Sequence, residues 1–229
     1  MKQEKIKEIL EKNKNDWNNL AEEFSQTRHN LWFELEDLKS YVKKGDRILD
    51  LGCGNGRLFE LFDQGVNYLG VDQSSRLIEL AKTKFPSGNF IVADALNLPF
   101  KDEFDVIFSI ALFHHLPSKE LRLKVLKNCY TLLKPGGFLI CMVWNFFQPW
   151  LIWKYNIGKI ILGFRNVFIP FKARSGKIKR YYYAFTKRGL KNLVKKAGFK
   201  GIKCYYVRKG QPVGRLKGYN LILIVKKNG

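Results

Sequence analysis

The stretch RILDLGCGNGR, residues 47–57, joins a short apolar run to three alternating glycines. Ile48, Leu49 and Leu51 predict a buried strand, and the glycines that follow predict a sharp turn at its end. Because glycine has no Cβ, such a turn lets the backbone approach a ligand closely. The spacing is G-x-G-x-G and not the G-x-G-x-x-G of dinucleotide-binding folds. The stretch therefore predicts a strand that ends in a ligand-binding turn.

Strands and helices alternate through the rest of the chain. Further strands are predicted at 67–72, 89–94, 104–111 and 138–144, and helices at 56–64, 75–84, 120–134 and 187–197. This alternation predicts an α/β fold with a mostly parallel sheet covered by helices on both faces. Ser118 and Thr186 are the predicted N-caps of the helices that follow them. Two closing strands, 201–207 and 220–225, complete a seven-stranded sheet and predict an antiparallel hairpin at its edge.

The length of 229 residues suits a single domain, residues 1–229, and an apolar content of 46% indicates a folded chain. Within it, residues 1–42 predict a helical cap, with a second helical stretch over 16–42, and residues 145–180 form an aromatic and basic insertion. The amphipathic start does not resemble a signal peptide, and no apolar run reaches the ~18 residues of a membrane span. The 4 cysteines lack the spacing of a zinc site or disulfide framework. We expect no metal, free thiols and a cytoplasmic location.

The charge of the chain is divided unevenly between its two halves. Residues 1–120 carry 16 basic and 20 acidic residues, whereas residues 121–229 carry 25 basic residues and no acidic one. These balances of −4 and +25 give the net charge of +21. A surface with cations and no intervening anions favours a polyanionic partner, with nucleic acid first and an anionic membrane second. A basic surface that serves only solubility is the alternative.

Carboxylates follow three predicted strands at their carboxyl ends. These are Asp50, Asp72 and Asp94. Ligands of open α/β sheets bind outside these strand ends. A carboxylate after the second strand is suited to accept both hydroxyls of a ribose, and one after the third to meet an adenine amino group. An NAD enzyme is disfavoured because the third glycine is misplaced.

From Asp46 to Trp144, the motifs DLGCGNGR, ADAL and LKPGG resemble those of the class I S-adenosylmethionine-dependent methyltransferases. The resemblance implies a Rossmann-like fold and S-adenosylmethionine as the cofactor. The methionine part is expected beside Asp50 and the glycine turn, the ribose beside Asp72, the adenine beside Asp94, and the sulfonium beside the end of the fourth strand. The implied cofactor residues are Asp50, Gly52, Cys53, Gly54, Asn55, Gly56, Asp72, Gln73, Asp94, Ala95, Leu96, Ser109, Ile110, Ala111 and His114.

Four other segments resemble a narrower group. FSQTR (24–28) with Trp32, SIALFHHLPS (109–118), VWNFFQ (143–148) and RYYYAF (180–185) are similar to the tRNA methyltransferases that esterify a carboxymethyl group on the wobble uridine. This group includes the methyltransferase domain of the AlkB-type fused enzymes. The chain departs from it at Tyr183, where a histidine is expected, and at Phe146-Phe147, where an acidic residue is expected before Gln148. The resemblance implies a tRNA anticodon arm as substrate and a small zinc-binding activator as a partner.

The expected catalytic residues are Arg28, His115, Trp144 and Tyr182. Arg28 is expected to hold the carboxylate or a phosphate, since a guanidinium binds such groups bidentately. His115 is expected to donate a hydrogen bond to the acceptor while His114 packs beside the cofactor, because neighbours on a strand point opposite ways. Trp144 or Tyr182 is expected to stack a flipped pyrimidine. The alternatives are a strand-capping role for the histidines, an ion pair of Arg28 with Glu22 or Glu23, and a merely structural tyrosine run at 181–183.

The basic residues expected to contact RNA lie in the insertion and in the loop before the last strand. They are Lys172, Arg174, Lys177, Lys179, Arg180, Arg208, Lys209, Arg215 and Lys217. The segment 146–164 is interpreted first as a lid, second as a docking face for a partner, and third as a membrane contact. Two further hypotheses remain open at this stage: methylation of a small or lipophilic acceptor at a membrane surface, and a non-catalytic RNA-binding protein.

Overall fold

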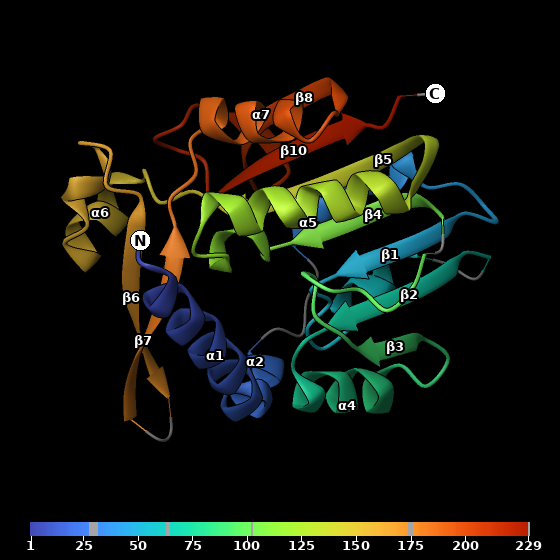
Figure 1. The fold of residues 1–229 in the computed structure, drawn as a ribbon, viewed down its shortest axis with the longest axis horizontal. Coiled ribbons are helices and arrows are strands. Elements are labelled where there is room, and N and C mark those ends of the chain that lie inside the picture. The colour runs from blue at the N-terminus through green and yellow to red at the C-terminus, as the bar shows by residue number, and fades with distance from the viewer. Residues whose placement is uncertain (28–31, 63–64, 102, 174–175, 229) are drawn as a thin grey trace.

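The computed structural model describes residues 1–27, 32–62, 65–101, 103–173 and 176–228. Its centre is an eight-stranded sheet with the strand order β3-β2-β1-β4-β5-β10-β8-β9 (Figure 1). The strands of this sheet are β1 Arg47–Leu51, β2 Asn67–Asp72, β3 Asn89–Val92, β4 Phe104–Ile110, β5 Leu133–Trp144, β8 Lys200–Arg208, β9 Gln211–Val213 and β10 Asn220–Lys226. Strands β6 (Asn166–Ala173) and β7 (Gly176–Tyr183) form a separate antiparallel hairpin.

The sheet confirms the predicted α/β fold. Strands β1 to β5 pair in parallel, and β10 pairs antiparallel with both β5 and β8. The predicted count of seven is corrected to eight, because the short strand β9 forms inside the expected connecting loop. The predicted antiparallel hairpin at the sheet edge is confirmed: β10 is its inner strand, between β5 and β8, and β9 is added outside β8. Residues 220–225 of β10 are all buried, and a strand covered on both faces belongs in the interior of a sheet.

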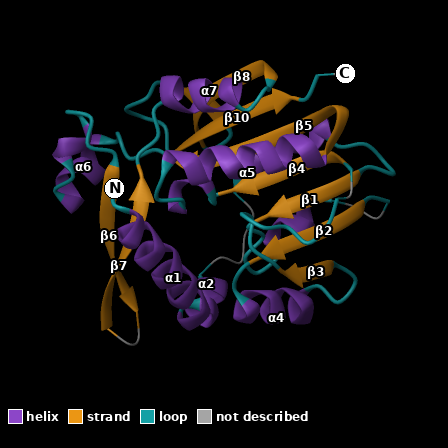
Figure 2. Ribbon diagram, in the orientation of Figure 1, coloured by secondary structure: helices purple, strands orange, loops and turns teal. Residues whose placement is uncertain are grey.

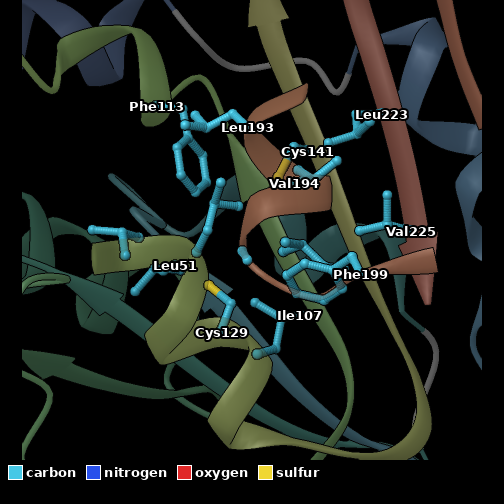
Figure 3. Close-up of a cluster of buried hydrophobic side chains, with 14 of the residues drawn as sticks. Leu51, Ile107, Phe113, Cys129, Cys141, Leu193, Val194, Phe199, Leu223 and Val225 are labelled. Carbon is cyan, nitrogen blue, oxygen red and sulfur yellow. The ribbon is translucent and has the colours of Figure 1, made fainter. Parts of the chain in front are cut away.

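Helices cover both faces of the sheet. The elements outside the strands are α1 Gln3–Asn19, α2 Ala21–Gln26, α3 Phe33–Glu36, η1 Asp37–Tyr41, η2 Arg57–Leu61, α4 Ser75–Lys84, η3 Phe113–His115, α5 Lys119–Leu132, α6 Pro149–Tyr155, η4 Gly158–Ile160 and α7 Lys187–Lys196. One core cluster lies between the sheet and helices α5 and α7, and a second includes residues of α3, η1, η2 and α4. In Figure 3, Cys129 and Cys141 lie among the apolar side chains of the first cluster. All four cysteines are buried and free.

The predicted helix caps are confirmed. The side chain of Ser118 accepts a hydrogen bond from the backbone N–H of Leu121, and Thr186 accepts one from Gly189. The predicted continuous helical stretch over 16–42 was wrong, because its described part is divided among α1, α2, α3 and η1. Asn18 and Asn19, at the first break, are weak helix formers.

The N-terminal helices and the β6–β7 hairpin lie at the end of the sheet where the parallel strands finish. Figure 2 shows α1 and α2 between this hairpin and the carboxyl ends of β1 and β2. Helix α1 contacts both α4 and β7. These elements therefore cover the edge at which α/β sheets bind their ligands. Among the described residues, no helix is long and apolar enough to cross a membrane.

Candidate active site

A pocket opens at the carboxyl ends of β1, β2 and β4. Its floor is formed by the glycine turn after β1 and by the residues that follow β2, β3 and β4. Helix α1 contributes Leu10, Asn13 and Trp17, and the β6–β7 hairpin contributes Phe171, Arg180 and Tyr182. The walls thus come from segments far apart in the sequence, and the pocket is deeper than the sheet edge alone would provide.

The glycine turn has the backbone conformation that its sequence requires. Gly52, Gly54 and Gly56 have φ angles of +83°, +56° and +76°, which L-residues other than glycine rarely adopt. The N–H groups of Gly52 and Cys53 both donate to the carbonyl oxygen of Val71, at 2.7 and 3.0 Å. A Cβ on Gly52 would lie 3.1 Å from Leu112 Cβ. The turn is therefore tied to β2 and has little room for a side chain at Gly52.

The carboxylates at the strand ends meet in this pocket. Asp72 is fixed by backbone N–H groups, since its Oδ2 accepts from Gly54 at 3.0 Å and its Oδ1 from Ser74 at 2.9 Å. Burial raises the pKa of Asp72, and these two hydrogen bonds oppose the rise. Asp94 Oδ1 accepts from the N–H of Leu96 at 2.9 Å. Three backbone donors thus hold two carboxylates at adjacent strand ends.

Asp50 is the most buried of the three carboxylates. Its Oδ2 accepts a hydrogen bond from the hydroxyl of Tyr68 at 2.7 Å. Burial raises the pKa of Asp50 to about 7, and the nearby charge of Asp72 adds to the rise while Tyr68 and Arg57 oppose it. A cation beside this carboxylate would restore its charged form. The position is suited to a ligand that carries an ammonium group.

The residues expected to bind a cofactor are mostly brought together. Of the fifteen, all but Gly56 and Ser109 line the pocket. Gly56 packs against the core instead, because a Cβ there would lie 2.8 Å from the ring of Phe90. The hydroxyl of Ser109 is buried inside β4 without a hydrogen-bond partner among the described residues. Ala111, which follows that strand, has a φ of +63° and donates its N–H to the carbonyl oxygen of Met142.

The two histidines lie on the short 3₁₀ turn η3 that follows β4, and not on a strand end. The expectation that they point opposite ways was therefore wrong, because residues on a 3₁₀ turn are rotated by about 120° and not 180°. Their ring centroids are 4.5 Å apart and both rings line the pocket. Burial lowers the pKa of His115 to about 3 and lowers that of His114 well below its ordinary value, with nearby Arg180 adding to both effects. Both rings are neutral at physiological pH.

The neutral rings present opposite groups to the pocket. His114 Nδ1 accepts a hydrogen bond from the backbone N–H of Trp144 at 3.2 Å, so its proton lies on Nε2. His115 Nδ1 lies 3.2 Å from the carbonyl oxygen of Tyr181, which only accepts, so its proton lies on Nδ1. The expected donor role of His115 is corrected accordingly: its remaining nitrogen is an acceptor. The buried Nε2–H of His114 has no partner among the described residues and is available as a donor.

Arg180 is a buried cation in the same pocket. Arg180 is only 7% exposed, which corrects the expectation that it contacts RNA on the protein surface. The guanidinium carbon lies 4.8 Å from the ring centroid of Trp17 and 4.5 Å from that of Phe171. Its Nε has no hydrogen-bond partner, and no acidic residue among those described pairs with it. A buried guanidinium without an anion is costly unless a ligand supplies one.

Trp144 and Tyr182 are close to the histidines but stack on each other. Their ring centroids are 5.3 Å apart with an interplanar angle of 15°. Each ring therefore already has one face covered, which leaves no slot between them for a base. Tyr182 also lies 4.7 Å from the ring of His115. Arg28, the remaining expected catalytic residue, lies outside the described residues.

The insertion has two parts with different surroundings. The hairpin part reaches the pocket through Phe171, Arg180 and Tyr182, whereas α6 and η4 do not line it. The lid interpretation of 146–164 is therefore wrong for α6 and η4, and the hairpin of β6 and β7 lines the pocket instead. Of the remaining predicted RNA contacts, those whose side chains are described are exposed, namely Lys179, Arg208, Lys209, Arg215 and Lys217. Arg174 lies outside the described residues, and of Lys172 and Lys177 only the backbone is described.

Several further residues from α1 line the pocket. Asn13 donates to the carbonyl oxygen of His115 at 3.0 Å, and Trp17 contacts both His115 and Arg180. Asn13 stands four residues after Ile9 and four before Trp17, so the sequence did place it on the apolar side of a helix. Among the described residues no group of His, Cys, Asp and Glu is arranged to hold a metal ion.

Comparison with known proteins decides the family. Residues 49–141 match the model of the methyltransferase domain family. The chain is 30% identical over 182 residues to a protein of Encephalitozoon cuniculi assigned to the methyltransferases, covering 79% of this chain and 83% of that one. The chain belongs to the S-adenosylmethionine-dependent methyltransferases. The methyltransferase is also 34% identical over 164 residues to the tRNA (carboxymethyluridine(34)-5-O)-methyltransferase of Saccharomyces cerevisiae, covering 71% of this chain and 57% of that protein.

Solved structures agree with the fold of the methyltransferase. A methyltransferase from Methanosarcina mazei superposes with a TM-score of 0.67 at 24% identity, covering 84% of this chain and 97% of that one. A second solved structure, a complex between the Trm112 methyltransferase activator of Haloferax volcanii and a methyltransferase, superposes with a TM-score of 0.65 at 16% identity. The match covers 93% of this chain and 98% of that one. The pocket of this methyltransferase fits the cofactor: the glycine turn leaves little room for a side chain at Gly52, the buried carboxylate of Asp50 is suited to a cation, and Asp72 and Asp94 lie at successive strand ends.

Proposed function

We propose that this methyltransferase transfers a methyl group to the carboxylate of a carboxymethyl-type substituent on a wobble uridine of tRNA. The yeast relative is named for carboxymethyluridine at position 34 of tRNA. The chain spans 57% of the length of that relative and 30% of the length of its Arabidopsis thaliana counterpart. The support from this chain itself comes from the chemistry of the acceptor side of the pocket.

The observation that carries the proposal is the unpaired cation of Arg180 in the pocket wall. A guanidinium binds a carboxylate through two parallel hydrogen bonds, and this pair is strong where water is excluded. No acidic residue follows Glu120 in the sequence, so the second half of the chain contains no competing anion. An anionic acceptor would supply the missing partner, whereas a neutral or cationic acceptor would leave Arg180 uncompensated.

Arg180 takes the role that we expected Arg28 to have. Its neighbours Trp17 and Phe171 hold the guanidinium by their ring faces, which fixes its position without using its N–H groups. The Nε2–H of His114, which has no partner among the described residues, is a further donor in the pocket. Together they are suited to hold the two oxygens of one carboxylate and to offset its charge.

S-adenosylmethionine, when bound, supplies an electrophilic methyl group on a sulfonium. A carboxylate is already ionised near neutral pH, since its ordinary pKa is about 4. The residues of the chain therefore need not remove a proton, and neither neutral histidine is required as a base. Their task is to orient the carboxylate and to exclude water, which is the positioning contribution to catalysis. The hairpin and α1, which cover the pocket, serve that exclusion.

The exposed cations complete the proposal on the RNA side. Arg208 and Lys209 lie at the β8–β9 turn, and Arg215 and Lys217 follow β9. Lys209 is anchored to the N-terminal cap, because its N–H donates to Glu34 Oε1 at 3.0 Å. We propose that these residues contact the phosphates of the anticodon arm. A small activator subunit, of the kind named in the Haloferax volcanii complex, is proposed as a partner.

The test is mass spectrometry of nucleosides from tRNA incubated with the protein and isotope-labelled cofactor. We expect the label in a uridine derivative that loses it as methanol under mild alkali, because a methyl ester hydrolyses there. A label that survives alkali, on a base nitrogen or a ribose oxygen, would contradict the carboxylate acceptor. Label transfer to lipid extracts and not to tRNA would favour the lipophilic-acceptor alternative.

A further inference from the structure

An exposed apolar surface lies outside the pocket, on α6, on the turn after η4 and on the loop before β10. It comprises Trp150, Trp153, Ile161, Leu162, Phe164 and Leu216, which we call the α6 patch. Trp153 is 87% exposed, Leu162 78% and Phe164 66%. Large apolar residues grouped in this way on one surface mark an interaction site and not ordinary surface composition.

The α6 patch comes from one helix, one turn and one loop, and three of its members meet in space. Trp153, Ile161 and Leu216 line one shallow groove, whose other lining residues are mainly apolar. Leu162 and Phe164 flank Gly163, which has a φ of +102° and open space around it. The turn thus projects from the molecule. In Figure 1, α6 lies at the outer end of the fold, next to the start of β6 and away from β1 to β3.

Cations lie within and beside the segments of the α6 patch, and these segments contain no acidic residue. Lys154, Lys159, Arg215 and Lys217 are exposed within or beside the same segments. The ammonium group of Lys154 lies 5.5 Å from the ring centroid of Trp150. No acidic residue occurs after Glu120, so none interrupts this charge in the sequence.

We propose that the α6 patch docks the protein on the surface of an anionic lipid bilayer. Tryptophan, phenylalanine and leucine insert at the boundary between headgroups and acyl chains, and adjacent lysines and arginines attract anionic lipids. This inference goes beyond the proposed function and does not depend on it. The membrane contact, ranked last for this segment from the sequence, is favoured because the structure removes α6 from the lid.

Two other occupants fit the observations less well. A second copy of the chain would bring the cations of both patches together without any anion between them. Single-stranded RNA would stack on aromatic rings, but Ile161, Leu162 and Leu216 offer no ring for stacking. An acidic protein would satisfy the charge, yet a projecting turn with two exposed apolar tips is shaped for insertion and not for a flat contact.

The test is flotation of the full chain with vesicles of phosphatidylcholine alone or mixed with phosphatidylglycerol. We expect flotation with the anionic vesicles and at least roughly tenfold weaker binding to the neutral ones. The double variant Leu162→Ser/Phe164→Ser should lose at least about tenfold in vesicle affinity. Lys154→Gln and Lys159→Gln should each lose on the order of fivefold. Phe33→Ser, which removes an exposed apolar side chain elsewhere, should float like the wild type.

Brominated lipids provide a second readout, since they quench tryptophans that enter the bilayer. Quenching should be strong in the wild type and should fall in Trp150→Phe/Trp153→Phe, while that variant still floats. Cofactor affinity should be unchanged in every variant, which checks that each is folded. Absent flotation, equal flotation with neutral vesicles, or an unaffected Leu162→Ser/Phe164→Ser variant would overturn the proposal. That variant could instead float normally but lose affinity for tRNA, or for polyglutamate as a mimic of an acidic protein. Either result would assign the patch to RNA or to an acidic protein and would overturn the proposal equally.

Discussion

The rings of His114 and His115 lie 4.5 Å apart between their centroids and carry their protons on opposite nitrogens. The backbone N–H of Trp144 places the proton of His114 on Nε2, and the carbonyl oxygen of Tyr181 places that of His115 on Nδ1. Adjacent residues of one type therefore present a donor and an acceptor. The difference between the two rings is set by backbone groups of β5 and β7, two strands that are distant in sequence.

This relationship predicts different results for two substitutions of His114. Glutamine keeps an N–H near the position of Nε2, whereas asparagine keeps an oxygen near Nδ1 but has no donor that reaches as far. We expect His114→Gln to retain more turnover than His114→Asn, with the latter lowered on the order of 100-fold because a hydrogen bond to a charged acceptor is lost. Single-turnover rates at saturating cofactor measure the difference.

The matched comparison is His115→Ala. It removes a ring that lies 4.7 Å from Tyr182 and holds the Tyr181 carbonyl, so turnover should fall much more than cofactor affinity. If His114→Asn retained full turnover, its Nε2–H would have no part in holding the acceptor. If His115→Ala retained full turnover, the ring of His115 would have no part in the reaction.

The neutral histidines also predict the pH dependence of the reaction. Burial keeps the pKa of His115 at about 3 and that of His114 well below its ordinary value, so neither gains a proton near neutrality. The turnover number at saturating cofactor should be flat between about pH 6 and pH 8. The KM for the cofactor should instead rise as the pH falls through about 7, where Asp50 gains its proton in the free protein. An inflexion of the turnover number near pH 6.5, the ordinary pKa of histidine, would mean that one histidine ionises during catalysis.

Much of the sheet was predictable because its local signals agree. The apolar runs at Ile48–Leu51 and in β2 to β5, with helices capped by Ser118 and Thr186, leave few arrangements other than a parallel sheet. Which strand of the edge hairpin faces the sheet was less accessible. An antiparallel pair has the same turn signal whichever of its strands is the inner one, and only the two-sided burial of β10 decides.

The site was predictable on its cofactor side and not on its acceptor side. The glycine turn and the acidic strand ends are contiguous motifs whose chemistry is local. Arg180, in contrast, looked like one more surface cation in a basic run, and only the packing of the hairpin against α1 buries it. The tautomers of the histidine pair depend on backbone groups of Trp144 and Tyr181, which no sequence pattern places.

Asp50 predicts a conflict between stability and binding. Burial raises its pKa from 3.8 to about 7, so the folded state favours the protonated form. The stabilisation from this proton is complete below pH 3.8 and is lost as the pH rises through about 7. Asp50→Asn keeps an acceptor for Tyr68 and removes the charge. At about pH 8 the cofactor-free variant should be more stable than the wild type, by up to about 4 kcal/mol.

The measurement is thermal unfolding of both proteins at several pH values. The difference in Tm should be largest in mild alkali and should vanish below about pH 4. Cofactor affinity of Asp50→Asn should fall at least about tenfold, because the ammonium group loses its counter-charge. Equal Tm values at alkaline pH would show that the buried charge of Asp50 does not destabilise the folded protein.

The basic loop predicts the salt dependence of tRNA binding. Arg208, Lys209, Arg215 and Lys217 are exposed, so each phosphate contact they make releases a counterion. The logarithm of tRNA affinity should fall linearly with that of salt concentration, and each substitution to glutamine should reduce the slope by about one. Lys39→Gln, an exposed cation of the N-terminal half, is the matched control and should leave the slope unchanged. A flat salt response of the wild type would argue for a small neutral substrate.

Arg180 predicts that activity and stability respond in opposite directions. Methionine has a similar length and an apolar tip, so Arg180→Met should keep the contacts with Trp17 and Phe171 while removing a buried, uncompensated charge. The free energy of unfolding should therefore be unchanged or higher, whereas turnover on tRNA should fall on the order of 100-fold. Arg208→Met, on an exposed arginine, should weaken tRNA binding several-fold and leave turnover intact. Activity assays at saturating tRNA, paired with chemical unfolding, separate the two effects. A destabilised Arg180→Met variant with normal turnover would mean that Arg180 supports the fold and does not hold the acceptor.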